Sequence, residues 1–251
     1  MTASNRQELD ELMLGTKFTS RLAVLIDYGI IVSQAVIDSF ELGIVNSHFS
    51  LLPEWRGADP ITFSILSGQK ETGVSLMLLV QAMDEGPLLA QTTYDLTDTI
   101  TTPALTQDLI ELSDASLRHI LPAYLAGDVQ PVPQRQVALP GHDVPTYSRK
   151  LTKTDGILDF GRSAVELERQ VRAFADWPKS RMTLAGKDVV VTASHVVADT
   201  PAGLATGAVQ ANKTEGSILI ATSDGCLSID KLKPAGKNEM DARAFLAGNH
   251  L

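Results

Sequence analysis

The chain has 251 residues, of which 44% are hydrophobic and 20% charged, and its formal net charge is −9. This composition is that of an ordinary globular protein with enough apolar material for at least one core. The single cysteine, Cys226, excludes a disulfide framework, and the five scattered histidines form no zinc-type cluster. No stretch approaches the ~20 apolar residues of a membrane span, and the polar, acidic start is unlike a signal peptide, which predicts a cytoplasmic protein.

Apolar runs of strand length alternate with helical patterns through the first half of the chain. Leu22–Ile26 is a continuous apolar run, typical of a strand buried on both faces of a parallel sheet. Thr102 and Pro103 are expected to open a long helix with a leucine stripe that ends near Ala126. The alternation predicts an α/β fold with a parallel or mixed, Rossmann-like sheet. Further short elements are predicted as helices at 5–13, 32–40 and 60–66 and as strands at 44–46, 73–80 and 88–96.

The second half of the chain has a different organisation. Residues 127–145 contain four prolines and no periodicity, which predicts a semi-rigid linker. Ser163 and Glu166 form a capping-box pattern ahead of a helix. Several short β-rich runs with glycines follow, and these predict a small barrel of the oligonucleotide-binding type. The expected organisation is therefore a first domain at 1–126, a linker at 127–145 and a β-barrel domain at 146–251.

The charge is distributed unevenly between the two halves. Residues 1–145 hold 7 basic and 18 acidic residues, a net of −11, whereas residues 146–251 hold 14 and 12, a net of +2. A binding surface for RNA is therefore expected in the second half. The sequence leaves open whether this difference is ordinary asymmetry.

Polar side chains with catalytic potential follow the predicted strand at 44–46. In an extended chain Asn46 and His48 point the same way, and strand ends in α/β sheets open into the crevice where ligands bind. Asp84 follows another predicted strand, at a turn expected to lie at the same edge. The amide can donate to a developing oxyanion, and a histidine near its ordinary pKa can exchange a proton. These groups suit acyl-type transfer to an amine.

The residues alone leave simpler readings open. His48 can be a structural histidine beside a strand, and residues 50–53 can be an apolar loop packed on the core. The stretch NSHFSLLPEWRGADPI, followed 38 residues after Asn46 by Asp84 in MDEGP, nevertheless resembles the folate-dependent formyltransferases. In the second half, the runs TYSRKLTKTDGILDF, RQVRAFADWP and DGCLSIDKLKPAGKNEMDARAFLAG resemble the C-terminal domain of the methionyl-tRNA formyltransferase family.

The resemblance implies transfer of a formyl group from 10-formyltetrahydrofolate to the amine of methionyl-tRNA, for translation initiation. Asn46 and protonated His48 would stabilise the oxyanion, and Asp84 would support His48. No metal, no covalent intermediate and no membrane contact are implied, and a monomer with methionyl-tRNA as its partner is expected. The resemblance also assigns a folate site to Tyr28, Gly29, Ser50, Leu51, Leu52 and Pro53.

Relatives in the family begin with a complete βαβ unit, and this sequence is expected to lack it, so that the sheet would be incomplete and expose an apolar edge. Two alternatives follow from the resemblance. The chain could formylate a sugar-nucleotide amine instead, or it could bind tRNA or folate without turnover.

Overall fold

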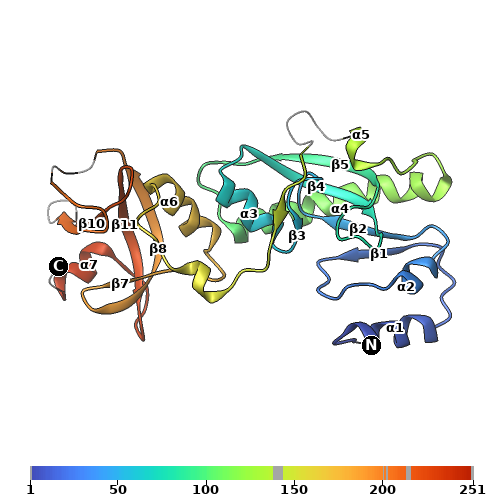
Figure 1. Cartoon of the computed structure of the whole chain (residues 1–251), viewed down its shortest axis with the longest axis horizontal. Helices are drawn as coiled ribbons and strands as arrows, with labels where there is room; N and C mark the ends of the chain where they lie inside the picture. The colour runs from blue at the N-terminus through green and yellow to red at the C-terminus, as the bar shows by residue number, and fades with distance from the viewer. Residues whose placement is uncertain (1, 138–143, 200, 202, 213–215, 250–251) are drawn as a thin grey trace. The chain divides into compact units, whose positions relative to one another are not determined.

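The computed structural model describes residues 2–137, 144–199, 201, 203–212 and 216–249 (Figure 1). The chain divides into two compact units. The first comprises Met1–Ser64, Lys70–Leu96 and Thr106–Lys150, and the second comprises Ile65–Gln69, Thr97–Leu105 and Leu151–Leu251. No helix within the described ranges is long and apolar enough to cross a membrane.

The first unit is built on a mixed four-stranded sheet with the strand order β1-β2-β4-β5. β1 and β2 are parallel, whereas β4 is antiparallel to both β2 and β5, so the α/β prediction is confirmed with a mixed sheet. The bounds in this part of the chain are α1 Arg6–Gly15, β1 Ala23–Ile26, α2 Gln34–Asp38, β2 Ile44–His48, β3 Arg56–Gly57, α3 Pro60–Ser67, β4 Glu71–Leu78, β5 Leu88–Asp95 and α4 Thr102–Ala126.

The first strand differs from the sequence expectation. Residues Ala23–Ile26 of the predicted run do form β1, but β1 is an edge strand, and the prediction of burial on both faces is wrong for it. Val24 and Ile26 are 43% and 46% exposed, so burial alternates along the strand. The side chains of a strand are covered on both faces only where helices pack on both sides, which an apolar run does not by itself guarantee.

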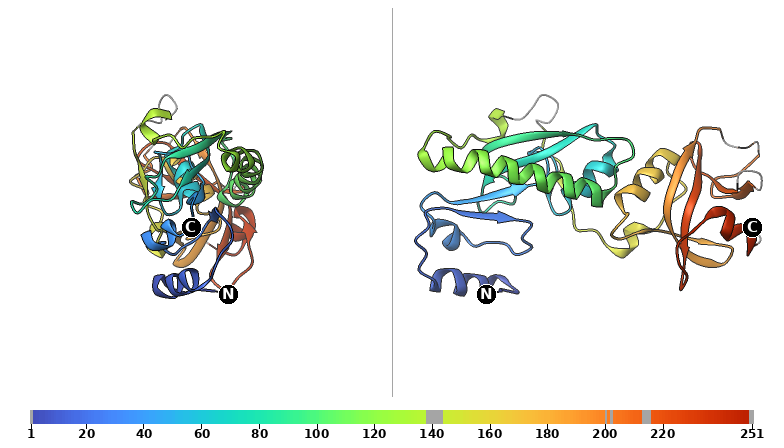
Figure 2. Two further views of the ribbon diagram at one scale, coloured as in Figure 1. Left: turned by 90° about the vertical axis from the view of Figure 1, so that its right-hand side faces the viewer. Right: turned by 180° about the vertical axis from the view of Figure 1, so that it is seen from behind.

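The long helix α4 lies along the sheet of the first unit (Figure 2). Leu109 and Leu117 on its expected stripe are buried. Hydrogen bonds fix it to β2 and to the turn before β2: the hydroxyls of Ser47 and Ser113 lie 2.6 Å apart, and the Tyr124 hydroxyl donates to the carbonyl of Leu42 at 2.9 Å. The helix therefore supports the strand that bears Asn46 and His48.

The segment expected to be a linker is partly structured. Val132 pairs with Leu88 at the start of β5, and a short helix, α5 (Gln134–Val137), follows. After residues 138–143, which lie outside the described part of the chain, β6 (Tyr147–Ser148) pairs in parallel with β3. This segment, 127–145, is called the strap below. The domain boundaries expected at 126 and 146 stay a prediction.

The second unit is an antiparallel sheet with the order β7-β8-β11-β10-β9, and β12 pairs with β11. Among the described strands, the two outer strands β7 and β9 do not pair with each other, so the sheet is a half-barrel instead of the expected barrel. The capping box of Ser163 and Glu166 is present, and the apolar side chains of Leu167 and Val171 join the core. The bounds are η1 Lys153–Gly156, α6 Ala164–Ala173, β7 Ser180–Leu184, β8 Lys187–Val197, β9 Val209–Asn212, β10 Ser217–Ala221, β11 Cys226–Pro234, β12 Met240–Asp241 and α7 Ala242–Ala247.

Candidate active site

Asn46 and His48 lie on β2, which extends two residues beyond the predicted strand, to His48. Alternate residues of a strand share one face, so both side chains point to the same side of the sheet, as expected. They are nearly buried, at 8% and 7% exposed. Among the residues that the structure describes, the side-chain amide of Asn46 has no hydrogen-bond partner. Its donors are therefore free for a substrate oxygen.

Asp84 reaches His48 from the loop between β4 and β5. Its Oδ1 lies 3.8 Å from Nδ1 of His48, and its Oδ2 accepts a hydrogen bond from the backbone N–H of Gly57 at 2.7 Å. Because β4 runs antiparallel to β2, the end of β4 lies beside the beginning of β2. The loop, rather than a shared strand edge, therefore brings the carboxylate to the imidazole.

The imidazole of His48 has a defined tautomer. Its Nε2 lies 3.0 Å from the backbone carbonyl of Trp55, and a carbonyl oxygen can only accept, so Nε2 carries the hydrogen. The neutral ring therefore presents the lone pair of Nδ1 on the side of Asp84. Burial lowers the pKa of His48, and the Asp84 carboxylate and the Trp55 carbonyl oppose this only in part. The expectation of an ordinary pKa is wrong, and the neutral form is favoured at neutral pH.

Gly57 is required where the chain passes Asp84. Its φ of +105° is a conformation that L side chains rarely adopt. A Cβ at this position would also lie 2.5 Å from the carbonyl oxygen of Ser148 in β6. The glycine thus lets β3 pair closely with β6 while its N–H is directed at the Asp84 carboxylate.

The loop expected to line the folate site lies in the core. Ser50, Leu51, Leu52 and Pro53 are buried, and the Ser50 hydroxyl donates to the carbonyl of Glu54 at 2.5 Å. Their side chains therefore shape the site by packing, and lining of a ligand site by these residues stays a prediction. Tyr28 and Gly29 are exposed and follow β1, whose end lies beside the end of β2, so the two loops leave the same edge of the sheet.

Arg56, Glu85 and Gln134 lie near this site, Arg56 contacts the other two, and the spacing of residues in the sequence does not predict these contacts. Nη2 of Arg56 donates to Oε1 of Gln134 at 2.7 Å, and Nη1 of Arg56 lies 3.2 Å from Oε1 of Glu85. Gln134 belongs to the strap, 50 residues after Asp84, and no periodic pattern marks it. In the sequence, Arg56 is marked only by its place in the Trp-Arg-Gly that follows the apolar loop.

No group of three or more His, Cys, Asp or Glu side chains within the described ranges could hold a metal ion.

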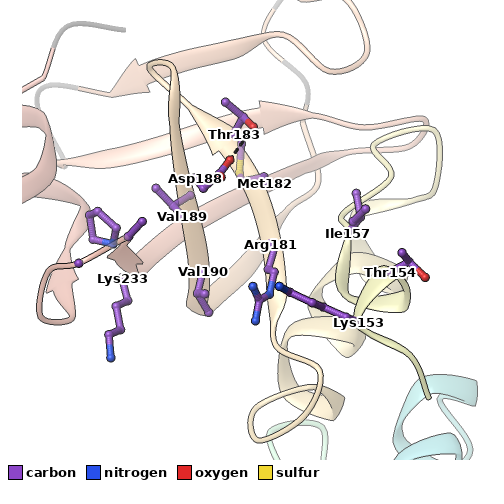
Figure 3. A pocket seen from close by; sticks show the side chains of 13 residues that line it. Lys153, Thr154, Ile157, Arg181, Met182, Thr183, Asp188, Val189, Val190 and Lys233 are labelled. Carbon is purple, nitrogen blue, oxygen red and sulfur yellow. Dashed lines mark hydrogen bonds between the residues drawn. The ribbon is translucent and has the colours of Figure 1, made fainter. Parts of the chain in front are cut away.

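The second unit carries a groove of about 560 Å³ beside β7, β8 and the end of β11. Its lining combines apolar side chains such as Ile157 with the cations of Lys153, Arg181 and Lys233. Figure 3 shows the Lys153 and Arg181 side chains extending toward the same end of the groove. The groove is thus cationic and partly apolar, in a unit that is much less acidic than the first.

Comparison with known proteins extends over almost the whole chain. A family model described as formyl transferase matches residues 2–121, and one described as formyl transferase, C-terminal domain, matches residues 150–250. Methionyl-tRNA formyltransferase of Myxococcus xanthus is 37% identical over 235 residues, which are 94% of this chain and 72% of that protein. The chain belongs to the methionyl-tRNA formyltransferase family. The enzyme of the same name from Halorhodospira halophila is 39% identical over 230 residues, 92% of this chain and 72% of that protein.

Solved structures agree with this family in fold. HypX from Aquifex aeolicus, in complex with tetrahydrofolic acid, has a TM-score of 0.65 and 17% identity, covering 90% of this chain and 38% of that chain. WlaRD, a sugar 3N-formyl transferase, has a TM-score of 0.63 and 17% identity, covering 86% of this chain and 73% of that chain. At this identity the likeness concerns the formyltransferase fold alone.

Proposed function

We propose that this protein transfers the formyl group of 10-formyltetrahydrofolate to the amine of methionyl-tRNA, which serves the initiation of translation. The observation that carries the proposal is the arrangement of an unpaired amide on a nearly buried residue, a neutral imidazole and an anchored carboxylate on a formyltransferase fold. Relatives named methionyl-tRNA formyltransferase, matched over both domains, support the choice of acceptor.

The side chains of the site fit a bound folate. Asn46 is only 8% exposed, and its side-chain amide has no partner among the described residues and is not fully buried, so a carbonyl oxygen of a ligand can reach its donors. Tyr28 and Gly29 would border the folate, and the buried turn at 50–53 would shape its site. When bound, the folate supplies the formyl group.

The side chains of the site have distinct roles in this mechanism. Asn46 donates a hydrogen bond to the oxygen that becomes negative when the amine adds to the formyl carbon. His48 accepts the proton of the amine at Nδ1, since Nε2–H is held by the carbonyl of Trp55. It returns this proton to the nitrogen of the formyl donor when the bond between that nitrogen and the formyl carbon breaks. Asp84 stabilises the imidazolium that forms, because Gly57 keeps its carboxylate beside Nδ1. The lowered pKa of His48 therefore gives it the role of proton acceptor, instead of a cation present from the start.

The second unit is proposed to bind the tRNA. Residues 146–251, which hold most of this unit, carry a net charge of +2, in contrast to −11 over the first 145 residues, and the groove presents Lys153, Arg181 and Lys233. Phosphate groups are bound by such lysine and arginine side chains, without regard to base sequence.

The test is the rate of formyl transfer from 10-formyltetrahydrofolate to methionyl-tRNA by this chain and by two variants. His48→Ala is expected to lower kcat/KM by about 10²- to 10⁴-fold, the usual contribution of a general base. His119→Ala, an exposed histidine on α4, is the matched control and is expected to keep the wild-type rate. Formylation that persists in His48→Ala contradicts the assigned role. A preference for a sugar-nucleotide amine in acceptor competition, or tRNA binding without turnover, contradicts the proposed reaction.

A further inference from the structure

Gln134 is a buried amide that connects the strap to the loop bearing Asp84. It is the first residue of α5 and is 5% exposed. Its Nε2 donates to the backbone carbonyl of Asp84 at 2.7 Å and to that of Gly86 at 2.9 Å. One side chain from a distant segment therefore holds the backbone on both sides of Glu85.

The orientation of this amide is fixed by its partners. Two carbonyl oxygens face Nε2, and carbonyls only accept, so both N–H groups of Gln134 are used. The amide oxygen accepts from Nη2 of Arg56 at 2.7 Å, and Nη1 of Arg56 lies 3.2 Å from Oε1 of Glu85. Arg56 thus orients Gln134 and also binds the loop that Gln134 holds.

The loop needs such a hold because its backbone is unusual. Asp84 has φ of +53°, a left-handed conformation uncommon for a residue with a side chain. At Gly86 a Cβ would collide with the carbonyl oxygen of Leu78, so the chain there passes against β4. Conformations of this kind persist where the surroundings determine them, and they cluster at functional sites.

We propose that Gln134 is a positioning residue of the formyl-transfer site, which holds the backbone of Asp84 so that its carboxylate stays between the Gly57 amide and the His48 ring. The expected effect on the rate of formyl transfer rests on the proposed function. The inference adds Gln134, a residue of the strap, to the residues that position the catalytic groups. The carboxylate is then held at two points, by Gly57 at Oδ2 and by Gln134 through the backbone. Displacement of a catalytic group by about 1 Å can cost about 100-fold in rate.

The first experiment needs no substrate. The titration of His48 is followed by NMR in the wild type, Gln134→Met, Asp84→Asn and Gln136→Met. Methionine keeps most of the volume of glutamine without its donors, and Gln136 is an exposed glutamine on the same short helix. The groups that contact the His48 ring are the Asp84 carboxylate and the Trp55 carbonyl, and both remain in Gln134→Met, as does the Arg56–Glu85 ion pair.

The Asp84 carboxylate raises the pKa of His48, so a carboxylate that moves away leaves this pKa lower than in the wild type. Gln134→Met is therefore expected to shift the pKa of His48 downward, as Asp84→Asn does, whereas Gln136→Met leaves it unchanged. An unchanged titration of His48 in Gln134→Met overturns the proposal. This result does not depend on which amine the enzyme formylates.

The second experiment measures kcat and KM for methionyl-tRNA. Gln134→Met is expected to lower kcat by about 10- to 100-fold and to leave KM within about 2-fold. Added to Asp84→Asn, it is expected to lower kcat little further, because residues that act through one another are non-additive. An equal loss in both backgrounds indicates a general structural role and overturns the proposal. Wild-type protein without formylation contradicts the proposed function, while the titration still decides the role of Gln134.

A second variant guards against a folding defect in Gln134→Met. Gln134→Glu keeps the volume and the contact with Arg56, but its carboxylate faces the carbonyl oxygens of Asp84 and Gly86. The same loss of kcat is expected, and wild-type kcat in this variant overturns the proposal.

Discussion

The chemistry of the site depends on how the imidazole of His48 is held beside the carboxylate of Asp84. His48 is buried, and its Nε2 is engaged by the carbonyl of Trp55, so the face toward Asp84 is the one available for a proton. Burial disfavours the charged imidazolium, whereas the neighbouring carboxylate favours it. The first effect is the larger, so the resting ring is neutral, and in the proposed mechanism it becomes charged only when it accepts the proton of the amine.

This balance predicts the pH dependence of the reaction. A base acts in its neutral form, which exists above its pKa, and burial places the pKa of His48 below the ordinary value of about 6.5. The acid limb of kcat/KM is therefore expected below pH ~6.5, and Asp84→Asn is expected to move it lower still. The measurement is kcat/KM across pH with the stability of the protein followed in parallel. An acid limb above pH ~6.5 would contradict the lowered pKa of His48, and a kcat/KM that falls as the pH rises through this range would show that His48 acts in its protonated form.

Gly57 is the residue at which a single methyl group should disturb this arrangement most. In Gly57→Ala, the Cβ would meet the Ser148 carbonyl at 2.5 Å, and φ of +105° is strained for alanine. We expect a loss of about 1–3 kcal/mol in the free energy of unfolding, together with a lower kcat because the N–H moves from Asp84. Denaturant unfolding and kcat measure the two effects. Gly127→Ala, also at positive φ but in open space, is the control and should keep kcat.

At the scale of elements, the turn after β2 is held by a hydroxyl in β4. The Ser75 hydroxyl donates to the carbonyl of Ser50 at 2.7 Å and accepts from the N–H of Leu52 at 3.0 Å. Nε2 of Gln91 donates to the same hydroxyl at 3.0 Å and to the carbonyl of Leu52 at 2.8 Å. This network fixes the backbone of the turn inside the core, since Ser75 is fully buried.

The network makes Ser75→Ala a costly change for its size. The variant leaves a buried N–H and a buried carbonyl without their partner, and such groups cost about 1–3 kcal/mol. We expect unfolding at lower denaturant and weaker binding of tetrahydrofolate, measured by chemical denaturation and by fluorescence titration. Ser39→Ala, which removes one hydroxyl bonded to a helix carbonyl, is expected to cost less. Equal stability of Ser75→Ala and the wild type would contradict the role of the network.

How much of this architecture the sequence predicts depends on the distance between the interacting residues. Strands, helices and the capping box follow from local spacing, and so does the shared orientation of Asn46 and His48. A shared strand edge predicts the approach of Asp84 to His48, but β4 is antiparallel to β2, and the loop after β4 reaches back to the imidazole instead. Gln134 could not be found, since prolines and the lack of periodicity mark the strap as a linker, whereas its bonds are made with residues 48–78 positions away.

At the scale of the whole molecule, the distribution of charge indicates which half of the chain would contact the phosphates of a tRNA. The first 145 residues carry a net of −11, which repels a polyanion, while residues 146–251 carry +2. A tRNA bound to such a chain is therefore expected to make its phosphate contacts through the second unit. Not every cation there is available: Arg172 is paired with Glu168 at 2.6 Å and donates to the carbonyl of Ile100 at 2.8 Å. The groove cations are better candidates.

Lys153 and Lys233 allow this expectation to be tested, because both are exposed at the groove. Lys153→Gln and Lys233→Gln are each expected to weaken binding of methionyl-tRNA and to reduce the slope of log K against log salt by about 1. The physical reason is that each phosphate contact releases a counterion, which a neutral side chain does not. Filter binding over a salt series measures both quantities. Arg118→Gln, an exposed cation of the acidic unit, is the matched control and is expected to leave the slope unchanged. A slope that falls only in the control would move the tRNA surface to the first unit.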